Sequence, residues 1–147
     1  MEKLNTDLYK YIQDENFWTS SRKYGNQLHP KPETNFVVFN NEIIGNFRVV
    51  WNEKLTGLSQ EKQLKLHRLY LHPKTQNKGV GKTIISWLEA QARFKDYEIL
   101  WLDAMEKQEQ AFQFYKKRGY KYHAHVFLEF NLMHGSFRKM NQVYKVL

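Results

Sequence analysis

The feature that most constrains the fold is a change in hydrophobic spacing near the middle of the chain. Leucines alternate over residues 63–71, as they do on one face of a β-strand. From residue 80 onward apolar residues recur every four positions, as on one face of an α-helix: Val80, Ile84, Leu88 and Ala92. The spacing predicts a strand, a short loop and then a helix over residues 79–94, an order that begins an α/β unit.

The segments on the C-terminal side complete that unit and extend it. Residues 97–105 form a short apolar run that suits a buried strand, and residues 109–118 form an amphipathic helix that Gly119 closes. Alternating residues over 120–132 and a last strand over 140–146 follow. We therefore expect a mixed α/β fold in which antiparallel strands flank a strand, helix, strand unit.

The N-terminal part predicts a helix and a β-hairpin. Residues 3–17 are expected to form an amphipathic helix, because their apolar residues fall on one helical face, and no convincing strand precedes the hairpin. Two strand-like runs, FVVF and EIIGNFRVVW, flank the pair Asn40-Asn41, which tolerates the positive φ angles of a tight turn. In the strand that follows, the alternation changes phase at His67-Arg68, which indicates a β-bulge.

Composition limits the classes of partner that the chain could bind and excludes several kinds of chemistry. Lys and Arg number 23 against 15 Asp and Glu, a net charge of +8, which favours a nucleic acid, an acidic membrane surface or a polyphosphate ligand. Because the chain has no cysteine, it has no disulfide, thiolate nucleophile or cysteine-ligated metal. Its longest apolar runs, at 36–39 and 99–102, are too short to span a bilayer, and the first ten residues lack a secretory signal. We expect one domain over residues 1–147 in a soluble cytoplasmic protein.

The loop before the predicted helix at residue 79 is the best candidate for a ligand site. Gly79 and Gly81 let the backbone approach a ligand where the helix begins, and the free amides at that end attract an anion such as a pyrophosphate. Lys78 and Lys82 add positive charge. The same glycines also fit an ordinary turn between a strand and a helix.

The residues around this loop fit one phosphate motif and not another. The phosphate loop of nucleotide triphosphatases requires a glycine where Gln76 stands. The order Gln76-x-x-Gly79-x-Gly81 instead matches the Gln/Arg-x-x-Gly-x-Gly/Ala signature of the GNAT (GCN5-related N-acetyltransferase) family. The stretch WLDAMEKQEQAFQFYKKRGYKY, at 101–122, resembles the strand and helix that follow in this family. The chain after Gly119 loosely resembles members that acetylate polyamines or small amines. A +8 protein is an awkward host for a polycation unless Asp103, Glu106 and Glu109 form a local acidic pocket.

The resemblance implies a fold and a co-substrate. The expected fold is a mixed, mostly antiparallel sheet flanked by helices, with a V-shaped splay between its two central parallel strands. Acetyl-CoA is the expected co-substrate, with its pantetheine arm along the strand before the loop and its pyrophosphate on the loop amides. The residues that the resemblance places on it are Leu69, Tyr70, Leu71, Gln76, Asn77, Lys78, Gly79, Val80, Gly81, Lys82, Gln108 and Tyr115.

Acetyl transfer requires a neutral amine, a stabilised oxyanion and a protonated leaving thiolate. Tyr115 matches the tyrosine that the family commonly places beside the thioester sulfur. A phenol titrates near about 10 and a thiol near about 8.5, so a tyrosine can protonate the thiolate without being ionised itself. The backbone amide near Leu71 could polarise the carbonyl group. Tyr115 also fits as a core aromatic, since Ala111 and Phe112 share its helical face.

Two residues compete for the role of general base. Asp103 matches a position that is acidic in some relatives, but it could equally orient the turn that follows it. His67 lies on the preceding strand and titrates in the useful range, but it could equally be a structural residue. Glu106 is a weaker third candidate. No metal site is expected, because His123 and His125 lack a third ligand nearby.

The expected function is therefore acetyl transfer to a primary amine of a small molecule or peptide. Direct attack within a ternary complex is favoured, because no cysteine is present to form an acyl-enzyme. Two rival functions are a basic nucleic-acid-binding module, which lacks a recognisable stacking motif or recognition helix, and an idle relative that only senses acyl-CoA. Neither nucleic acid nor a membrane is expected as a partner, and a homodimer is expected from the resemblance alone.

Overall fold

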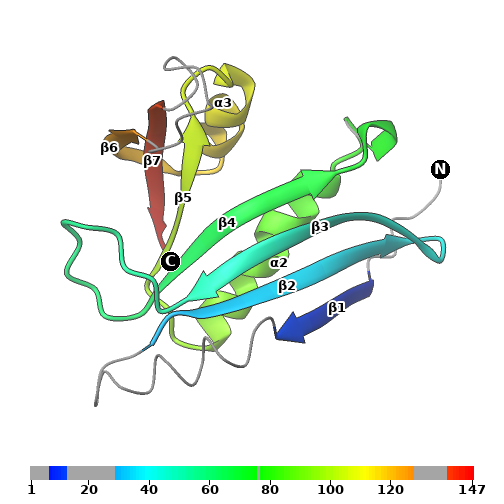
Figure 1. The fold of residues 1–147 in the computed structure, drawn as a ribbon, viewed down its shortest axis with the longest axis horizontal. Helices are drawn as coiled ribbons and strands as arrows, with labels where there is room; N and C mark the ends of the chain where they lie inside the picture. The colour runs from blue at the N-terminus through cyan, green and yellow to red at the C-terminus, as the bar shows by residue number, and fades with distance from the viewer. Residues whose placement is uncertain (1–6, 13–28, 76, 128–138) are drawn as a thin grey trace.

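A computed structural model describes residues 7–12, 29–75, 77–127 and 139–147. These residues form one seven-stranded sheet in the order β1-β2-β3-β4-β5-β7-β6 (Figure 1). The strands are β1 (Asp7–Ile12), β2 (Lys31–Phe39), β3 (Glu42–Trp51), β4 (Gln63–Leu71), β5 (Ile99–Met105), β6 (Lys121–Phe127) and β7 (Lys139–Val146). The helical segments are the short 3₁₀ turn η2 (Pro73–Thr75), α2 (Val80–Phe94) and α3 (Glu109–Lys117). The mixed, mostly antiparallel α/β architecture that the sequence predicts is confirmed.

The pair Asn40-Asn41 forms the hairpin turn between β2 and β3. The φ angles of the two residues are 49° and 62°, which lie in the left-handed region that a tight hairpin requires. On β3 itself, Gly45 lies against the next strand, because a Cβ atom there would collide with the backbone oxygen of Tyr70. Strands β3 and β4 are therefore held in close antiparallel contact near the end of β4.

The two central strands pair in parallel over only part of their length. Residues Gln63–Leu66 of β4 pair with Ile99–Leu102 of β5, and no later residue of β4 pairs with β5. Figure 1 shows the two strands diverging beyond this point, with α3, β6 and β7 on the arm that β5 begins. The expected V-shaped splay is confirmed, and its apex lies just after Leu66 and Leu102.

A β-bulge in β4 lies at the apex of this splay. Arg48 pairs with Arg68 and Val49 pairs with Leu66, so His67 is left without a partner on β3. The bulge confirms the change of phase seen in the sequence. The bulge also determines which side chains of β4 face the core, because Leu66 and Leu69 pack into the main core while the two residues between them do not.

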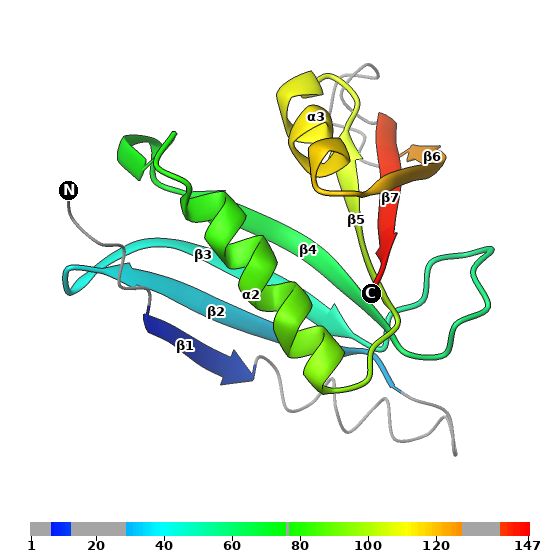
Figure 2. The ribbon, with the colours of Figure 1, turned by 180° about the vertical axis from the view of Figure 1, so that it is seen from behind.

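The main core lies between α2 and the sheet (Figure 2). The apolar stripe of α2 packs against β2, β3 and β4, and Tyr115 of α3 joins the same core beside β5. The fully buried residues of this core include Val37, Phe47, Val49, Leu64, Ile84, Ile85, Leu88 and Leu100. The opposite face carries a small cluster of Leu55, Ile99 and Trp101. This arrangement leaves the second face of β3 and β4 uncovered by either helix.

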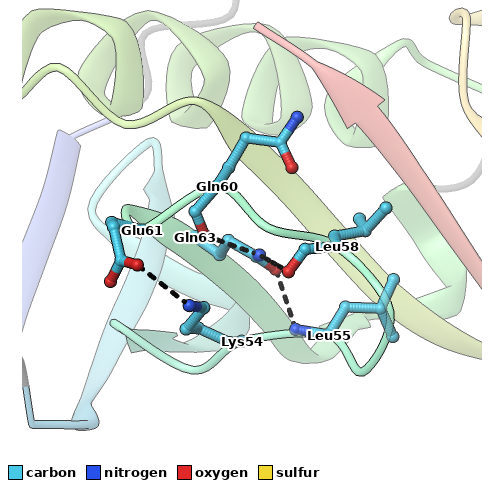
Figure 3. A network of polar contacts seen from close by, with 6 residues as sticks. All are labelled: Lys54, Leu55, Leu58, Gln60, Glu61 and Gln63. Atoms are coloured by element: carbon cyan, nitrogen blue, oxygen red, sulfur yellow. Dashed lines mark hydrogen bonds and ion pairs between the residues drawn. The ribbon is translucent and has the colours of Figure 1, made fainter.

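A buried glutamine fixes the loop between β3 and β4 (Figure 3). Gln63 is fully buried, and its side-chain oxygen accepts a hydrogen bond of 2.8 Å from the Leu55 amide. Its side-chain nitrogen donates to the Leu58 oxygen at 3.3 Å and to the Gln60 oxygen at 2.9 Å. Both ends of the Gln63 amide are thus satisfied, which holds the loop beneath the parallel pair.

The predicted N-terminal helix is wrong over the residues that the structure describes. Residues 7–12 form β1, which pairs antiparallel with β2 from Asp7 opposite Val38 to Ile12 opposite Glu33. The segment DLYKYI is rich in residues that favour strands, and the open edge of β2 supplies hydrogen bonds that outweigh a helical spacing of four. The rest of the predicted helix, and the predicted strand beyond Phe127, lie outside the described residues.

Candidate functional site

The loop before α2 presents unused backbone amides. Asn77 and Gly79 have φ angles of 62° and 75°, and Gly79 is the N-cap of α2 without any side-chain cap. The first helical bond runs from the Thr83 amide to the Gly79 oxygen at 3.1 Å, so the amides of Val80–Lys82 are left unsatisfied by the helix. The first turn contains no acidic residue. Amides at a helix start with no acid beside them suit an anionic ligand.

The residues of this loop differ in what they can offer a ligand, because some are exposed and others are buried. A Cβ atom on Gly79 would meet nothing within 4 Å, so its positive φ, and not crowding, is what favours glycine. Lys78 and Lys82 are exposed, whereas the Val80 side chain is buried in the core and leaves only its backbone for a ligand. Gln76, the first residue of the signature, lies outside the described residues.

Gly81 lies where α2, α3 and β4 meet. A Cβ atom there would lie 3.5 Å from Phe114 Cζ and 3.8 Å from Leu71 Cδ1. The amide-rich end of α2 therefore adjoins the V-shaped opening between β4 and β5, which is called the V below. Sequence reasoning missed Phe114, although it stands next to Tyr115 in the matched motif.

The end of β4 presents a free strand edge to the V. Residues Leu69–Leu71 pair with β3 on one side and lie beyond the last pair with β5 on the other. Leu69 and Leu71 pack against the main core, and Tyr70 is 53% exposed on the opposite face. An extended ligand with amide groups could pair with this edge as an added strand would.

Tyr115 lies on the helix side of the V with its hydroxyl group free. Its side chain is 7% exposed, and its ring contacts those of Phe114 and Tyr120 edge-on, at centroid distances of 5.1 and 5.4 Å. Burial raises the pKa of Tyr115 to about 12, partly opposed by the charge of Arg118. Within the described residues the hydroxyl group has no hydrogen-bond partner. The phenol is thus protonated at neutral pH and able to donate.

A buried polar cluster stands behind Tyr115 and joins the two arms of the V. The Tyr120 hydroxyl donates to Glu89 of α2 at 2.9 Å, and Lys145 of β7 donates to the same carboxylate at 2.8 Å. Glu89 is 6% and Tyr120 4% exposed. Burial and the adjacent Glu89 carboxylate both raise the pKa of Tyr120, so this hydroxyl group also stays protonated.

His67 and Asp103 flank the apex of the V on the face that no described helix covers. They are the first residues beyond the last parallel pair, Leu66 with Leu102. Asp103 Oδ2 forms an ion pair of 3.3 Å with Lys65, while its other oxygen is buried without a partner. The carboxylate is thus already committed in part to a neighbouring cation.

His67 is held in its neutral form. Partial burial lowers its pKa below the ordinary 6.5, and the positive charges of Lys65, Arg48 and Arg68 lower it further, against an opposing effect of Asp103. At neutral pH the imidazole therefore carries no charge and can accept a proton.

A cavity of about 300 Å³ opens beside His67. It lies on the face opposite α2 and is lined by Pro30, Pro32, Arg48, Val50, Glu53, Lys65 and His67. The sequence reasoning missed Arg48 and Lys65. Only the strand register could have revealed them, because it brings Arg48 of β3 opposite Arg68 of β4 and Lys65 of β4 opposite Val50 of β3.

Gln108 and Glu106 lie apart from this cavity. Gln108 is the N-cap of α3, and both residues line a separate hollow of about 900 Å³ that also includes Phe127 and Lys139. Glu106 forms an ion pair of 3.2 Å with Lys139, so its carboxylate is already engaged. The structure brings together His67 and Asp103, but it does not bring Glu106 to them.

Two other expectations concern metals and membranes. His123 Nε2 lies 2.7 Å from the Thr56 oxygen, and across the described ranges no three His, Asp or Glu side chains form a group that could hold a metal ion. None of the helices in the described part of the chain is long and apolar enough to cross a bilayer.

Sequence comparisons find a matching family and more than one curated relative. A model of the acetyltransferase (GNAT) family matches residues 1–120. An uncharacterized N-acetyltransferase from the pepI 3′ region of Lactobacillus delbrueckii subsp. lactis is 28% identical over 94 residues, which are 63% of this chain and 54% of that protein. The chain thus spans about half the length of this curated relative.

Solved structures show the same fold. A GNAT family acetyltransferase from Elizabethkingia anophelis, solved with acetyl-CoA bound, has a TM-score of 0.67 and 14% identity, covering 97% of this chain and 99% of its own. Arabidopsis thaliana Naa50, solved with the bisubstrate analogue CoA-Ac-MVNAL, has a TM-score of 0.66 and 15% identity, covering 91% and 82%. At these identities the likeness is one of fold.

Proposed function

Because the chain belongs to the acetyltransferase (GNAT) family, we propose that it transfers the acetyl group of acetyl-CoA to a primary amine. One observation carries this proposal: the free edge at the end of β4 lies close to the uncapped start of α2, where a Cβ atom on Gly81 would be 3.8 Å from Leu71. A strand edge and a cluster of unused amides, joined in this order, match an acyl-pantetheine followed by a pyrophosphate. The acetyl-CoA-bound relative from Elizabethkingia anophelis, which shares the fold, supports the choice of co-substrate.

The binding roles follow from the faces of the V. The backbone of Leu69–Leu71 would pair with the pantetheine arm, and the amides from Asn77 to Lys82 would hold the pyrophosphate, with Lys78 and Lys82 adding charge. Acetyl-CoA supplies the activated thioester. The remaining chemistry belongs to residues of the chain at the apex of the V.

Proton transfer is assigned to two residues on opposite faces of the sheet. The amine nitrogen forms a C–N bond as the C–S bond breaks, the proton lost by the nitrogen passes to His67, and Tyr115 gives its proton to the departing sulfur. His67 is favoured over Asp103 because the imidazole is neutral, whereas the carboxylate is paired with Lys65. His67 then releases its proton to solvent and Tyr115 takes one from solvent, which restores both side chains.

The test combines binding and turnover. We expect the wild-type protein to bind acetyl-CoA in calorimetry and to release thiol when a suitable amine is added. Gly79→Asp should abolish binding, because it strains a φ of 75° and places a negative charge among the phosphate-facing amides. Asn41→Asp is the matched control: it adds the same charge at a position with a φ of 62° in the distant hairpin turn. Equal affinity in the Gly79→Asp and wild-type proteins would refute the placement.

A further inference from the structure

Two arginines lie side by side next to His67 without an acidic partner: Arg48 lines the cavity, and Arg68, which does not line it, stands opposite Arg48 on β4. Arg48 and Arg68 are directly opposite each other in the register of β3 and β4, so their side chains leave the same face of the sheet. Like charges in directly opposed positions repel and destabilise a sheet. Within the described residues neither guanidinium forms an ion pair or a hydrogen bond.

Arg48 is the more deeply placed of the pair. It is half-buried, it lines the 300 Å³ cavity together with His67, and its Nε atom is buried without a hydrogen-bond partner. A buried guanidinium nitrogen with no partner is costly unless a ligand satisfies it. The residue that carries this unpaired atom therefore also lines the cavity.

The nearby acids do not neutralise these arginines. Asp103 lies 3.3 Å and Glu53 lies 4.0 Å from Lys65, so both carboxylates are directed to the same lysine. The positive charges of Lys65, Arg48 and Arg68 all lower the pKa of His67, which shows that the excess positive field reaches the proposed base. A polycationic acceptor would be repelled by this field.

Building on the proposed acetyl transfer, we propose that the acceptor is a small amine that also carries an oxyanionic group, which Arg48 and Arg68 bind beside His67. A guanidinium offers donors in a planar fork that matches a carboxylate or a phosphate. The cavity lies at the lower end of the range for small-molecule sites, about 300–1,000 Å³. The same positive field favours the neutral form of the acceptor amine, the form that attacks the thioester.

The first test compares amines that differ only in the oxyanion. Thiol release from acetyl-CoA is measured with β-alanine against propylamine and with phosphoethanolamine against ethanolamine, and spermidine serves as the polycation. We expect the kcat/KM of the oxyanionic amine to be at least about 10-fold higher in one pair, and that pair identifies the oxyanion as carboxylate or phosphate. Equal or higher kcat/KM for both neutral amines, or for spermidine, overturns the proposal.

The second test removes the guanidinium. Arg48→Gln should lower the preference for the oxyanionic amine by about 10- to 100-fold, mainly through KM, and Arg48→Lys should restore part of it. Lys121→Gln, which removes the same charge from an exposed residue of β6, should leave the preference unchanged. The melting temperature of Arg48→Gln should not fall, since a repulsive pair is relieved. A folded Arg48→Gln protein with the wild-type preference contradicts the proposal.

A binding measurement separates this proposal from the transferase itself. β-Alanine and phosphoethanolamine are titrated into the protein without acetyl-CoA, and the Arg48 Nε–H signal is followed by NMR. A shift with an oxyanionic amine and none with propylamine or ethanolamine supports the oxyanion site even if no amine stimulates thiol release, in which case acetyl transfer alone fails. No shift with either oxyanionic amine overturns the oxyanion site.

Discussion

At the scale of single residues, the environment of Tyr115 keeps its phenol protonated well above neutral pH. The sequence motif places the residue on the right helix, but it also fits a core aromatic. The structure gives both descriptions at once, because the ring is packed in the core while the hydroxyl has no partner among the described residues. Burial, which raises the pKa to about 12, is a property that no sequence pattern encodes.

Tyr115→Phe should lower kcat by about 10² to 10⁴-fold, the usual contribution of a general acid, with little change in the affinity for acetyl-CoA. Because its pKa is raised to about 12, Tyr115 stays protonated to well above neutral pH, so wild-type kcat should not fall through its ionisation below about pH 11. Tyr97→Phe is the control, since it removes a hydroxyl that bonds to Asn52 outside the site. Unchanged kcat in Tyr115→Phe would exclude the assigned role.

His67→Gln decides between the two candidate bases. A base acts in its deprotonated form, so kcat/KM should rise with pH through the pKa of His67, with a midpoint below 6.5. His67→Gln should remove this acid limb and lower kcat/KM by about 10² to 10⁴-fold. Asp103→Asn should keep the limb, at a lower rate, because it releases Lys65. The reverse pattern, a limb lost only in Asp103→Asn, would assign the base to the aspartate.

At the scale of elements, local spacing predicts those segments whose neighbours reinforce it. The bulge at His67 is visible in the sequence because leucines on both sides of it face the same core. The helix expected over 3–17 is wrong over residues 7–12. Their spacing suits a helix and their composition suits a strand, and only the open edge of β2 selects the strand. The pairing of Arg48 with Arg68 lies beyond periodicity altogether, since it depends on the register of two strands that a loop separates.

The cluster at Glu89 should be the main link between α2 and the elements beyond β5. Glu89→Gln leaves Lys145 without its carboxylate and weakens the bond from Tyr120, so we expect a loss of about 1–3 kcal/mol in the free energy of unfolding. Urea denaturation measures this loss. Glu61→Gln, which breaks an exposed pair with Lys54, should change it by less than about 1 kcal/mol. Equal effects of the two substitutions would show that the buried cluster is not such a link.

At the scale of the whole molecule, the sequence predicts the binding half of the candidate site better than the acceptor half. The loop at Gly79 and Gly81 and the strand before it are contiguous in the chain, so a single motif identifies them. The cavity beside His67 is lined by residues of β2, β3 and β4, which are far apart in the sequence and come together only once the sheet has formed. Most of the +8 charge lies outside both parts and has no structural explanation in the described residues.

Strand β4 lies in the interior of the sheet, but it pairs with β5 over only part of its length. The rest of β4 therefore has a free edge, like the outermost strand of a sheet. Four residue pairs join these strands, and beyond them β4 has the unpaired backbone groups that elsewhere promote strand-to-strand aggregation. Natural proteins shield such edges with charges, bulges or covering elements. Here three features shield the edge from another strand: the bulge at His67, the exposed charge of Arg68 and the walls of the V. The free edge that suits a ligand is thus also a place where a second chain could pair, and a ligand bound in the V would shield it from aggregation.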